Sequence, residues 1–279
     1  MIIIDLNQVM ISNIMSQIGN HTNMKLEENM VRHMVLNSIL SFKNKHKEYG
    51  ELVIACDNTN VWRKQFFPYY KANRRKKQSS SELDWNSIFE CLNKIREELK
   101  LYFPYRVIDV MSAEADDVIA TLTFNIKDED ILILSGDKDF IQLHSNPRVK
   151  QFDPVRKKFV SHPDPKRYLI EHVLKGDSGD GVPNVLSNDD VFIVGDRQKP
   201  MTQKRINDFI NTDEDKLDQM MIRNYHRNRK LIDLSYVPNE IQNSILSQFS
   251  EQVNKDRSKL LDYFMKNRLK NLMESIGDF

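Results

Sequence analysis

The chain has 279 residues, of which 40% are hydrophobic and 29% charged, and its 41 Lys and Arg nearly balance its 40 Asp and Glu. This composition is typical of a globular protein and excludes a disordered or fibrous chain. The two cysteines, Cys56 and Cys91, exclude a disulfide framework and a cysteine-based zinc site.

Short aliphatic and β-branched runs alternate with segments of helical spacing along the first half of the chain. The expected strands cover 2–6, 52–56, 105–110 and 131–134. The expected helices cover 26–47, a segment that starts at Asp84, and 113–126. This alternation predicts an α/β fold with a mostly parallel central sheet flanked by helices. In such sheets, functional residues gather at the carboxyl ends of the strands.

After Val149 the pattern changes to two shorter strands, 149–152 and 158–160, and then to helix-rich sequence from Pro165 onward. The glycine-rich segment 176–181 predicts a turn or loop. A helix start is expected at Thr212, and an amphipathic, basic-faced helix from Ser258. The apolar runs are too short to span a bilayer, and no signal peptide follows Met1, so we expect a cytoplasmic protein without membrane contact.

Acidic residues recur where the four expected strands end. They are Asp5, Asp57, Glu114, Asp116, Asp117, Asp137 and Asp139. Each alone is typical of a helix cap or turn, but capping does not explain their recurrence after successive strands. Their mutual repulsion at one sheet edge is most simply explained by bound divalent cations, and oxygen ligands favour magnesium or manganese. Asp177 and Asp180, three residues apart, could hold a second metal on one side of a helical turn.

Residues 63–77 carry seven Lys or Arg and no acid, with four interleaved aromatic residues. Such a run is either a solvated surface segment or a nucleic-acid contact in which the rings stack on bases. A concentrated acidic site beside a basic exterior suggests bound metal ions and a polyanionic substrate.

Five acidic motifs, in this order, resemble the flap endonuclease or 5′-nuclease family, and the resemblance covers essentially the whole chain. They are Ile4-Asp5, Ala55-Cys56-Asp57, Glu114-Ala115-Asp116-Asp117, the stretch from Leu134 to Leu143, and Gly176 to Pro183. Within that family the sequence is most similar to the ribonuclease H branch of T-even bacteriophages. The resemblance implies a PIN-like 5′-nuclease fold with a helical arch. We therefore expect a catalytic lobe over 1–182, with a basic arch over 60–84, and a helix-rich C-terminal duplex- or partner-binding subdomain over 183–279.

The resemblance also implies roles for individual residues. One Mg²⁺ is expected near Asp5, Asp57, Glu114, Asp116 and Asp137, a second near Asp139, Asp177 and Asp180, with Asp117 lining the site and Mn²⁺ able to substitute. Lys71 first, and Arg74 second, are expected to contact the scissile phosphate. Other expected nucleic-acid contacts are Arg63, Tyr70 (stacked on a terminal base), Arg75, Lys76 and Lys77.

The predicted function is a phage-type, magnesium-dependent 5′→3′ exonuclease and flap endonuclease that acts on RNA–DNA and DNA duplexes and removes RNA primers during replication. Expected partners are nucleic acid with a 5′ flap or end, a phage single-strand binding protein and a sliding clamp. We expect a monomer in the cytosol of the infected host. Two alternatives stay open: another PIN-like metal-dependent ribonuclease, and a non-catalytic structure-specific binding protein.

The sequence departs from the family after Gly181, because no glycine-rich hairpin loop follows and the next glycine is Gly195. Duplex anchoring is therefore expected from other basic residues, either Lys199, Lys204 and Arg205 or the C-terminal helix. The basic run between Arg223 and Lys230 is either another contact to the nucleic-acid backbone or exposed charge, and we favour exposed charge.

Overall fold

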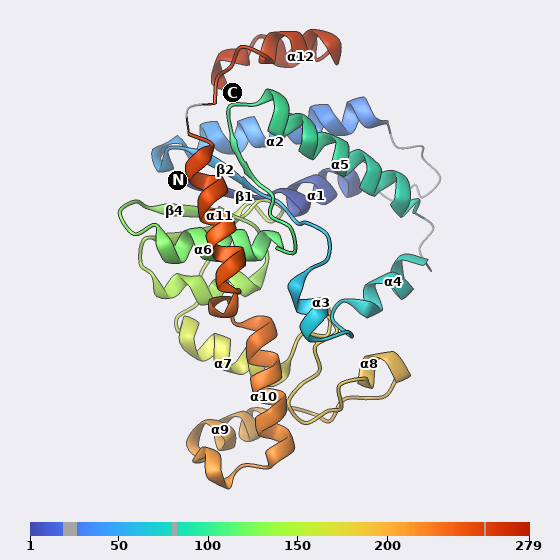
Figure 1. Cartoon of the computed structure of the whole chain (residues 1–279), viewed down its shortest axis with the longest axis vertical. Coiled ribbons are helices and arrows are strands. Elements are labelled where there is room, and N and C mark those ends of the chain that lie inside the picture. The colour runs from blue at the N-terminus through green and yellow to red at the C-terminus, as the bar shows by residue number, and fades with distance from the viewer. Residues whose placement is uncertain (19–26, 80–82, 254) are drawn as a thin grey trace.

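A six-stranded sheet forms the centre of the protein, whose structure is a computed structural model that describes residues 1–18, 27–79, 83–253 and 255–279 (Figure 1). The strand order is β3-β2-β1-β4-β5-β6. The strands are β1 (Ile2–Asp5), β2 (Leu52–Ala55), β3 (Arg106–Ile108), β4 (Ile131–Leu134), β5 (Val149–Asp153) and β6 (Lys158–Val160). Neighbouring strands are parallel except β5 and β6. The predicted α/β fold with a mostly parallel sheet is confirmed.

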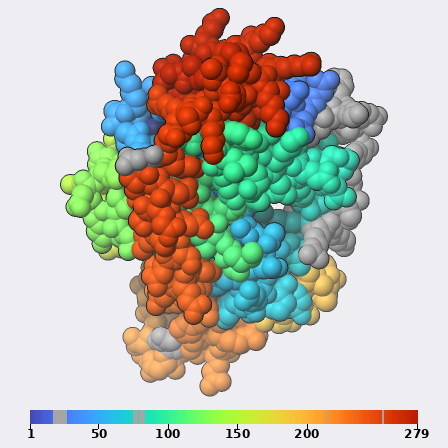
Figure 2. Space-filling model, turned by 45° about the horizontal axis from the view of Figure 1, so that its top comes forward, coloured from blue at the N-terminus to red at the C-terminus, as the bar shows by residue number. Residues whose placement is uncertain are grey.

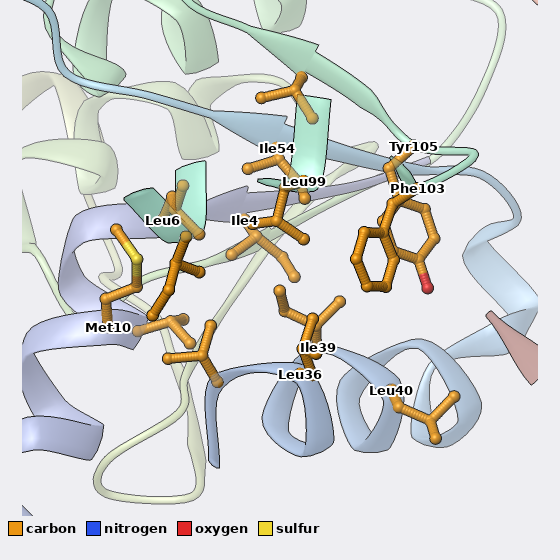
Figure 3. Packing of buried hydrophobic residues seen from close by; sticks show 14 of the residues in the cluster. Ile4, Leu6, Met10, Leu36, Ile39, Leu40, Ile54, Leu99, Phe103 and Tyr105 are labelled. Carbon is orange, nitrogen blue, oxygen red and sulfur yellow. The ribbon is translucent and has the colours of Figure 1, made fainter. Parts of the chain in front are cut away.

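One face of the sheet is covered by helices from both ends of the chain. They are α1 (Leu6–Ile18), α2 (Glu28–Lys45), α5 (Trp85–Tyr102), α12 (Leu260–Lys266) and α13 (Lys270–Met273). Successive strand residues point to opposite faces, so Ile4 and Ile54 enter this core together with Leu36 and Leu99 (Figure 3). The segment from residue 255 lies over this layer (Figure 2).

The opposite face holds a second core around Ile3 and Val53. It is covered by α6 (Ala115–Asn125), the 3₁₀ helix Lys138–Ser145 and α11 (Asn239–Glu251). Ile119 of α6 and Ile245 of α11 are fully buried there. The strands β1, β2 and β4 are therefore buried on both faces, which explains their runs of aliphatic residues.

The remaining helices extend away from the sheet, below it in Figure 1. They are α3 (Trp62–Phe66), α4 (Ala72–Ser79), α7 (Pro165–Lys175), α8 (Val191–Val194), α9 (Gln203–Asn211) and α10 (Gln219–Ile232). Short 3₁₀ helices cover Lys47–Tyr49, Glu214–Lys216, Leu234–Tyr236 and Ile276–Asp278. Two small hydrophobic clusters pack these helices together. None of the helices in the described ranges is both long and apolar enough to cross a membrane.

Two expected helices differ from the structure. The segment from Ser258 is not one helix, because Arg268 adopts a left-handed backbone (φ 56°) between α12 and α13. The helix expected at Thr212 starts instead at residue 219, where the Asp218 carboxylate accepts hydrogen bonds from the first-turn N–H groups of Met220 and Met221.

Candidate metal centre and gateway

The acidic residues that follow β1, β2 and β4 meet at one edge of the sheet. A hollow of about 460 Å³ is lined there by Asp5, Asp57, Asp116 and Asp137, and Lys71 and Arg74 also line it. Asp5 ends β1, and Asp137 caps the 3₁₀ helix after β4. Parallel strands place their carboxyl ends on one side, so this convergence follows directly from the topology.

The carboxylates of this first hollow repel one another. Burial and the charge of Asp57 raise the pKa of Asp5 to about 7. Burial and Asp137 raise the pKa of Asp116 well above its usual value, and burial also raises the pKa of Asp137. Clustered, buried oxygen donors with raised pKa values are a donor set that suits a hard divalent cation, whose charge would offset the repulsion.

A second hollow of about 380 Å³ lies on the other side of Asp137. Asp139 and Asp177 line it together with His172 of α7. Burial and Asp137 raise the pKa of Asp139 to about 7. Asp137 borders both hollows, so the two groups of acids predicted from the sequence lie side by side.

The sequence interpretation did not include His172. Its Nδ1 lies 3.4 Å from Asp139 Oδ1, and its Nε2 lies 3.8 Å from Asp177 Oδ2. His172 has no second histidine one helical turn away and lies instead beside carboxylates from two other segments, which the sequence does not show. The available signal was its place in the last turn of the helix that leads into the acidic turn.

Residues 176–182, which carry Asp177 and Asp180, form a turn, as the glycine-rich sequence predicted. The two acids do not lie on a helical turn, although their spacing had suggested one. Gly176 has φ 66°, and a Cβ there would lie 2.4 Å from the carbonyl oxygen of Val182. Asp177 Oδ1 accepts hydrogen bonds from the N–H groups of Gly179 and Asp180, at 2.7 and 3.1 Å. The backbone of Asp177 also pairs with Val182, which closes the turn. The turn thus leaves Asp177 Oδ2 directed toward His172.

Lys71 and Arg74, predicted from the sequence, reach the acidic residues. Lys71 Nζ lies 2.5 Å from Glu114 Oε1 and 3.4 Å from Asp180 Oδ2, and Arg74 pairs with Asp180 Oδ1. The Tyr70 hydroxyl lies 3.0 Å from Glu114 Oε2 and 2.9 Å from Asp180 Oδ2. Although burial opposes it, the charges of Lys71 and Arg63 lower the pKa of Glu114. Residues 69–74 therefore form a cationic segment, called the cationic gateway below, that lies against the candidate metal centre.

Three predicted site residues have structural roles instead. Arg63 is 2% exposed, donates hydrogen bonds to Glu114 Oε2 and the carbonyl oxygen of Leu231, and forms an ion pair with Asp117 Oδ1. The prediction that it contacts nucleic acid is therefore wrong. Asp117 is fully buried in this ion pair and caps the first turn of α6, so it does not line the site. The Tyr70 ring is 3% exposed, which contradicts stacking on a base.

The other basic residues fall into two groups. Lys199, Lys204 and Arg205 are exposed, as duplex anchoring requires. Arg227, interpreted as exposed charge, is buried and donates to the carbonyl oxygen of Pro183 at 2.9 Å while it pairs with Asp189. It thus holds the loop that follows Gly181, where the sequence departs from the family. The side chains of Arg75, Lys76 and Lys77 lie outside the described residues.

Family models match both parts of the chain. Residues 1–172 match the model described as "5'-3' exonuclease, N-terminal resolvase-like domain", and residues 165–279 match "T4 RNase H, C terminal". The chain is 35% identical to the ribonuclease H of Enterobacteria phage T4, over 99% of this chain and 95% of that protein. It is 32% identical to the flap endonuclease Xni of Shewanella sp. strain MR-4, over 48% of this chain and 52% of that protein.

Solved structures share the fold at low sequence identity. The bacteriophage T5 flap endonuclease, in a pseudo-enzyme-product complex with DNA and metal ions, has a TM-score of 0.64 and 16% identity, over 91% of this chain and 99% of that chain. The T5 5′-exonuclease with bound divalent zinc ions has a TM-score of 0.62 and 16% identity, over 90% and 98%. The chain therefore belongs to the 5′-3′ exonuclease family, in the group that contains phage T4 ribonuclease H.

Proposed function

We propose that this protein is a magnesium-dependent 5′→3′ exonuclease and flap endonuclease that hydrolyses phosphodiester bonds of DNA and RNA–DNA duplexes. Its role would be the removal of RNA primers during phage DNA replication. The observation that carries the proposal is the cationic gateway beside the two acidic hollows, where Lys71 lies 2.5 Å from Glu114. The proposal is supported by the similarity to two nucleases, the ribonuclease H of phage T4 and the flap endonuclease Xni of Shewanella.

Two groups of residues would hold two Mg²⁺ ions, with Mn²⁺ as a substitute. The first group is Asp5, Asp57, Asp116 and Asp137, and the second is Asp139 and Asp177. Glu114 and Asp180 accept hydrogen bonds from gateway side chains, so they would act through bound water and hold those side chains in place. When bound, such ions lower the pKa of water and neutralise phosphate charge.

The protein's own cations would act on the scissile phosphate. Lys71 and Arg74 lie at the rim of the first hollow, where a phosphate bound beside Asp137 would meet them. Positive charge already held in this place stabilises the extra negative charge of the transition state without reorganisation. Arg63 and Asp117 would act as a buried support for this arrangement, because Arg63 joins Glu114 to Asp117. We place all of this chemistry in a catalytic lobe over residues 1–182.

The proposal is tested by cleavage of end-labelled duplexes with DNA or RNA 5′ flaps, in Mg²⁺ and in EDTA. We expect cleavage near the junction and 5′→3′ shortening in Mg²⁺ alone. Tight binding without cleavage would support the non-catalytic alternative. Equal cleavage of substrates whose 5′ ends are blocked by a bulky group would support a PIN-like ribonuclease, which needs no free 5′ end.

We further propose partners and a place of action. Exposed cations on the C-terminal segment, among them Lys259, Lys266 and Lys270, would suit an acidic surface of a single-strand binding protein or a sliding clamp. The protein would act as a monomer in the cytosol of the infected host. Stimulation of cleavage by the purified replication proteins, measured before and after reversal of these charges, tests this part.

A further inference from the structure

His172 lies where it can join two carboxylates of the second hollow. One ligand atom from each of His172, Asp139 and Asp177 lies within 4.8 Å of the other two. Metal–ligand bonds of about 2.0–2.2 Å place ligand atoms on opposite sides of one ion about 4.0–4.4 Å apart. Small side-chain rotations therefore suffice for the three atoms to share an ion.

The surroundings of His172 leave its Nδ1 buried and without a hydrogen bond to any residue in the described ranges. Tyr168 packs its ring edge-on against the imidazole at 5.8 Å and so fixes the ring without using a nitrogen. The hollow in front of the imidazole is open, with Gly136, Asp137 and Ser178 on its walls.

The two hollows differ in the donors that they offer. The carboxylate and amide side chains of the first hollow, such as Asp5, Asp57 and Asn7, offer oxygen to a metal. The second adds an imidazole nitrogen to Asp139 and Asp177. Mg²⁺ favours oxygen ligands, whereas imidazole nitrogen favours transition metals. A site with an imidazole ligand therefore binds a transition-metal ion such as Mn²⁺ more tightly than it binds Mg²⁺.

We propose that His172 is a nitrogen ligand of the metal held by Asp139 and Asp177, and that it makes this second site prefer Mn²⁺ to Mg²⁺. This inference rests on the metal dependence in the proposed function. It assigns to the second site a metal preference that the first site, with oxygen donors, does not share.

Pulsed electron paramagnetic resonance of the full chain loaded with Mn²⁺ tests the bond directly. We expect nitrogen modulation from a bound imidazole in the wild type, and its loss in His172→Gln. The matched control is His33→Gln, which replaces a partly buried helical histidine that lines neither hollow and should keep the modulation. Absence of the modulation in the wild type, or its survival in His172→Gln, would overturn the proposal.

Calorimetric titration tests the metal preference. For His172→Gln we expect Mn²⁺ affinity at one site to fall on the order of 10–100-fold, with a smaller loss for Mg²⁺. Equal losses for both ions would mean that His172 acts only through general electrostatics or packing, and would overturn the proposal. If the variant does not fold, ¹⁵N-histidine labelling of the wild type decides, because a bound imidazole must then change the modulation frequency.

These measurements are independent of the proposed activity. If the protein cleaves flaps in Mg²⁺ but shows no nitrogen modulation with Mn²⁺, the role of His172 fails and the proposed function stands. If the modulation is present but no metal supports cleavage of any substrate, the proposed function fails and the ligand assignment stands.

Discussion

Asp137 lines both hollows, so its substitution can show separately the effects on substrate affinity and on the rate of cleavage. Asp137→Asn should abolish turnover with little loss of substrate affinity, because it removes a charged ligand of the proposed metal ions and also one negative charge that repels the phosphate. The amide oxygen can still accept the hydrogen bond from the Asp139 N–H. Single-turnover cleavage of a labelled flap, beside a binding measurement in Ca²⁺, checks this. A near wild-type rate would remove Asp137 from the metal ligands.

Lys71 should contribute to the rate rather than to affinity alone. Lys71→Ala is expected to lower kcat about 10²–10³-fold, the loss typical of one preorganised electrostatic group. Lys64→Ala is the matched control, since Lys64 belongs to the same basic run but is exposed and should change kcat little. If Lys71→Ala raises KM while kcat is preserved, Lys71 only steers the strand.

For individual residues, the sequence indicated that the acidic residues and Lys71 lie close together, but it did not indicate which basic residues are buried. Arg63 and Lys64 are neighbours in one basic run, yet Arg63 is buried and Lys64 exposed. The difference comes from Glu114 and Asp117, more than 50 residues away, whose charges compensate the buried guanidinium. Such pairing depends on the complete fold, so local spacing could not show it. The role of the metal-ligand residues stays a prediction until the variants are measured.

The turn over residues 176–182 is the element most sensitive to a small change. Gly176→Ala should impair metal binding and cleavage, because the added Cβ would collide with the Val182 carbonyl and displace Asp177. Gly195→Ala is the control: Gly195 also has positive φ (82°), but open space surrounds it. It should cost only the backbone strain, about 1–2 kcal/mol, and leave the metal titration unchanged.

Metal titration of both glycine variants, followed by thermal melting, separates the two effects. Equal activity of Gly176→Ala and Gly195→Ala would show that the position of Asp177 tolerates displacement of the turn. A Gly195→Ala variant that loses cleavage would show instead that backbone strain alone disables this part of the chain.

Elements with a strong local pattern were predictable, and those fixed by distant partners were not. The strands and α5 match the sequence interpretation, since aliphatic runs and the apolar stripe from Ile88 to Leu99 report burial directly. The loop after the acidic turn has no such pattern. Its carbonyl groups at Pro183 and Val185 accept hydrogen bonds from the buried amides of Asn228 and Asn224 in α10. That conformation is encoded some 40 residues downstream.

For the whole molecule, His46 should make stability depend on pH. His46 is buried beside the Phe152 ring, and burial and Lys45 lower its pKa. The unfolded chain therefore binds the proton more readily. The contribution of the neutral His46 ring to the free energy of unfolding is therefore complete above its pKa in the unfolded chain, about 6.5. This contribution falls as the pH decreases through that value.

Urea unfolding of the wild type and His46→Leu at pH 8 and pH 5.5 measures this contribution. The free energy of unfolding of the wild type minus that of the variant should be smaller at pH 5.5 than at pH 8. The acidic residues with raised pKa values have the opposite effect, but they are present in both proteins and cancel in this difference. A difference between the two proteins that does not change with pH would show that His46 titrates alike in the folded and unfolded states.

A substitution of Phe279 tests whether the C-terminal segment is part of the core. Phe279 is fully buried against Phe103 and Phe264, with ring centroids 5.6 and 5.3 Å apart. Phe279→Ala should lower the free energy of unfolding by about 3–5 kcal/mol while cleavage per folded molecule is preserved. Denaturant unfolding and active-site-normalised rates check both statements. Unchanged stability, together with lost stimulation by a replication protein, would make the segment a docking element instead.

The covering of one sheet face by residues 260–279 has a consequence for biosynthesis. Ile4 and Ile54 are made early, but Phe264 and Phe279, in the same core, are made more than 200 residues later. At translation rates of about 5–20 residues per second, this interval is on the order of 10–40 s. During that time the nascent chain exposes an incomplete apolar face to the ribosome and chaperones. We therefore expect the core on this face to reach its full stability only after residues 260–279 have been synthesised.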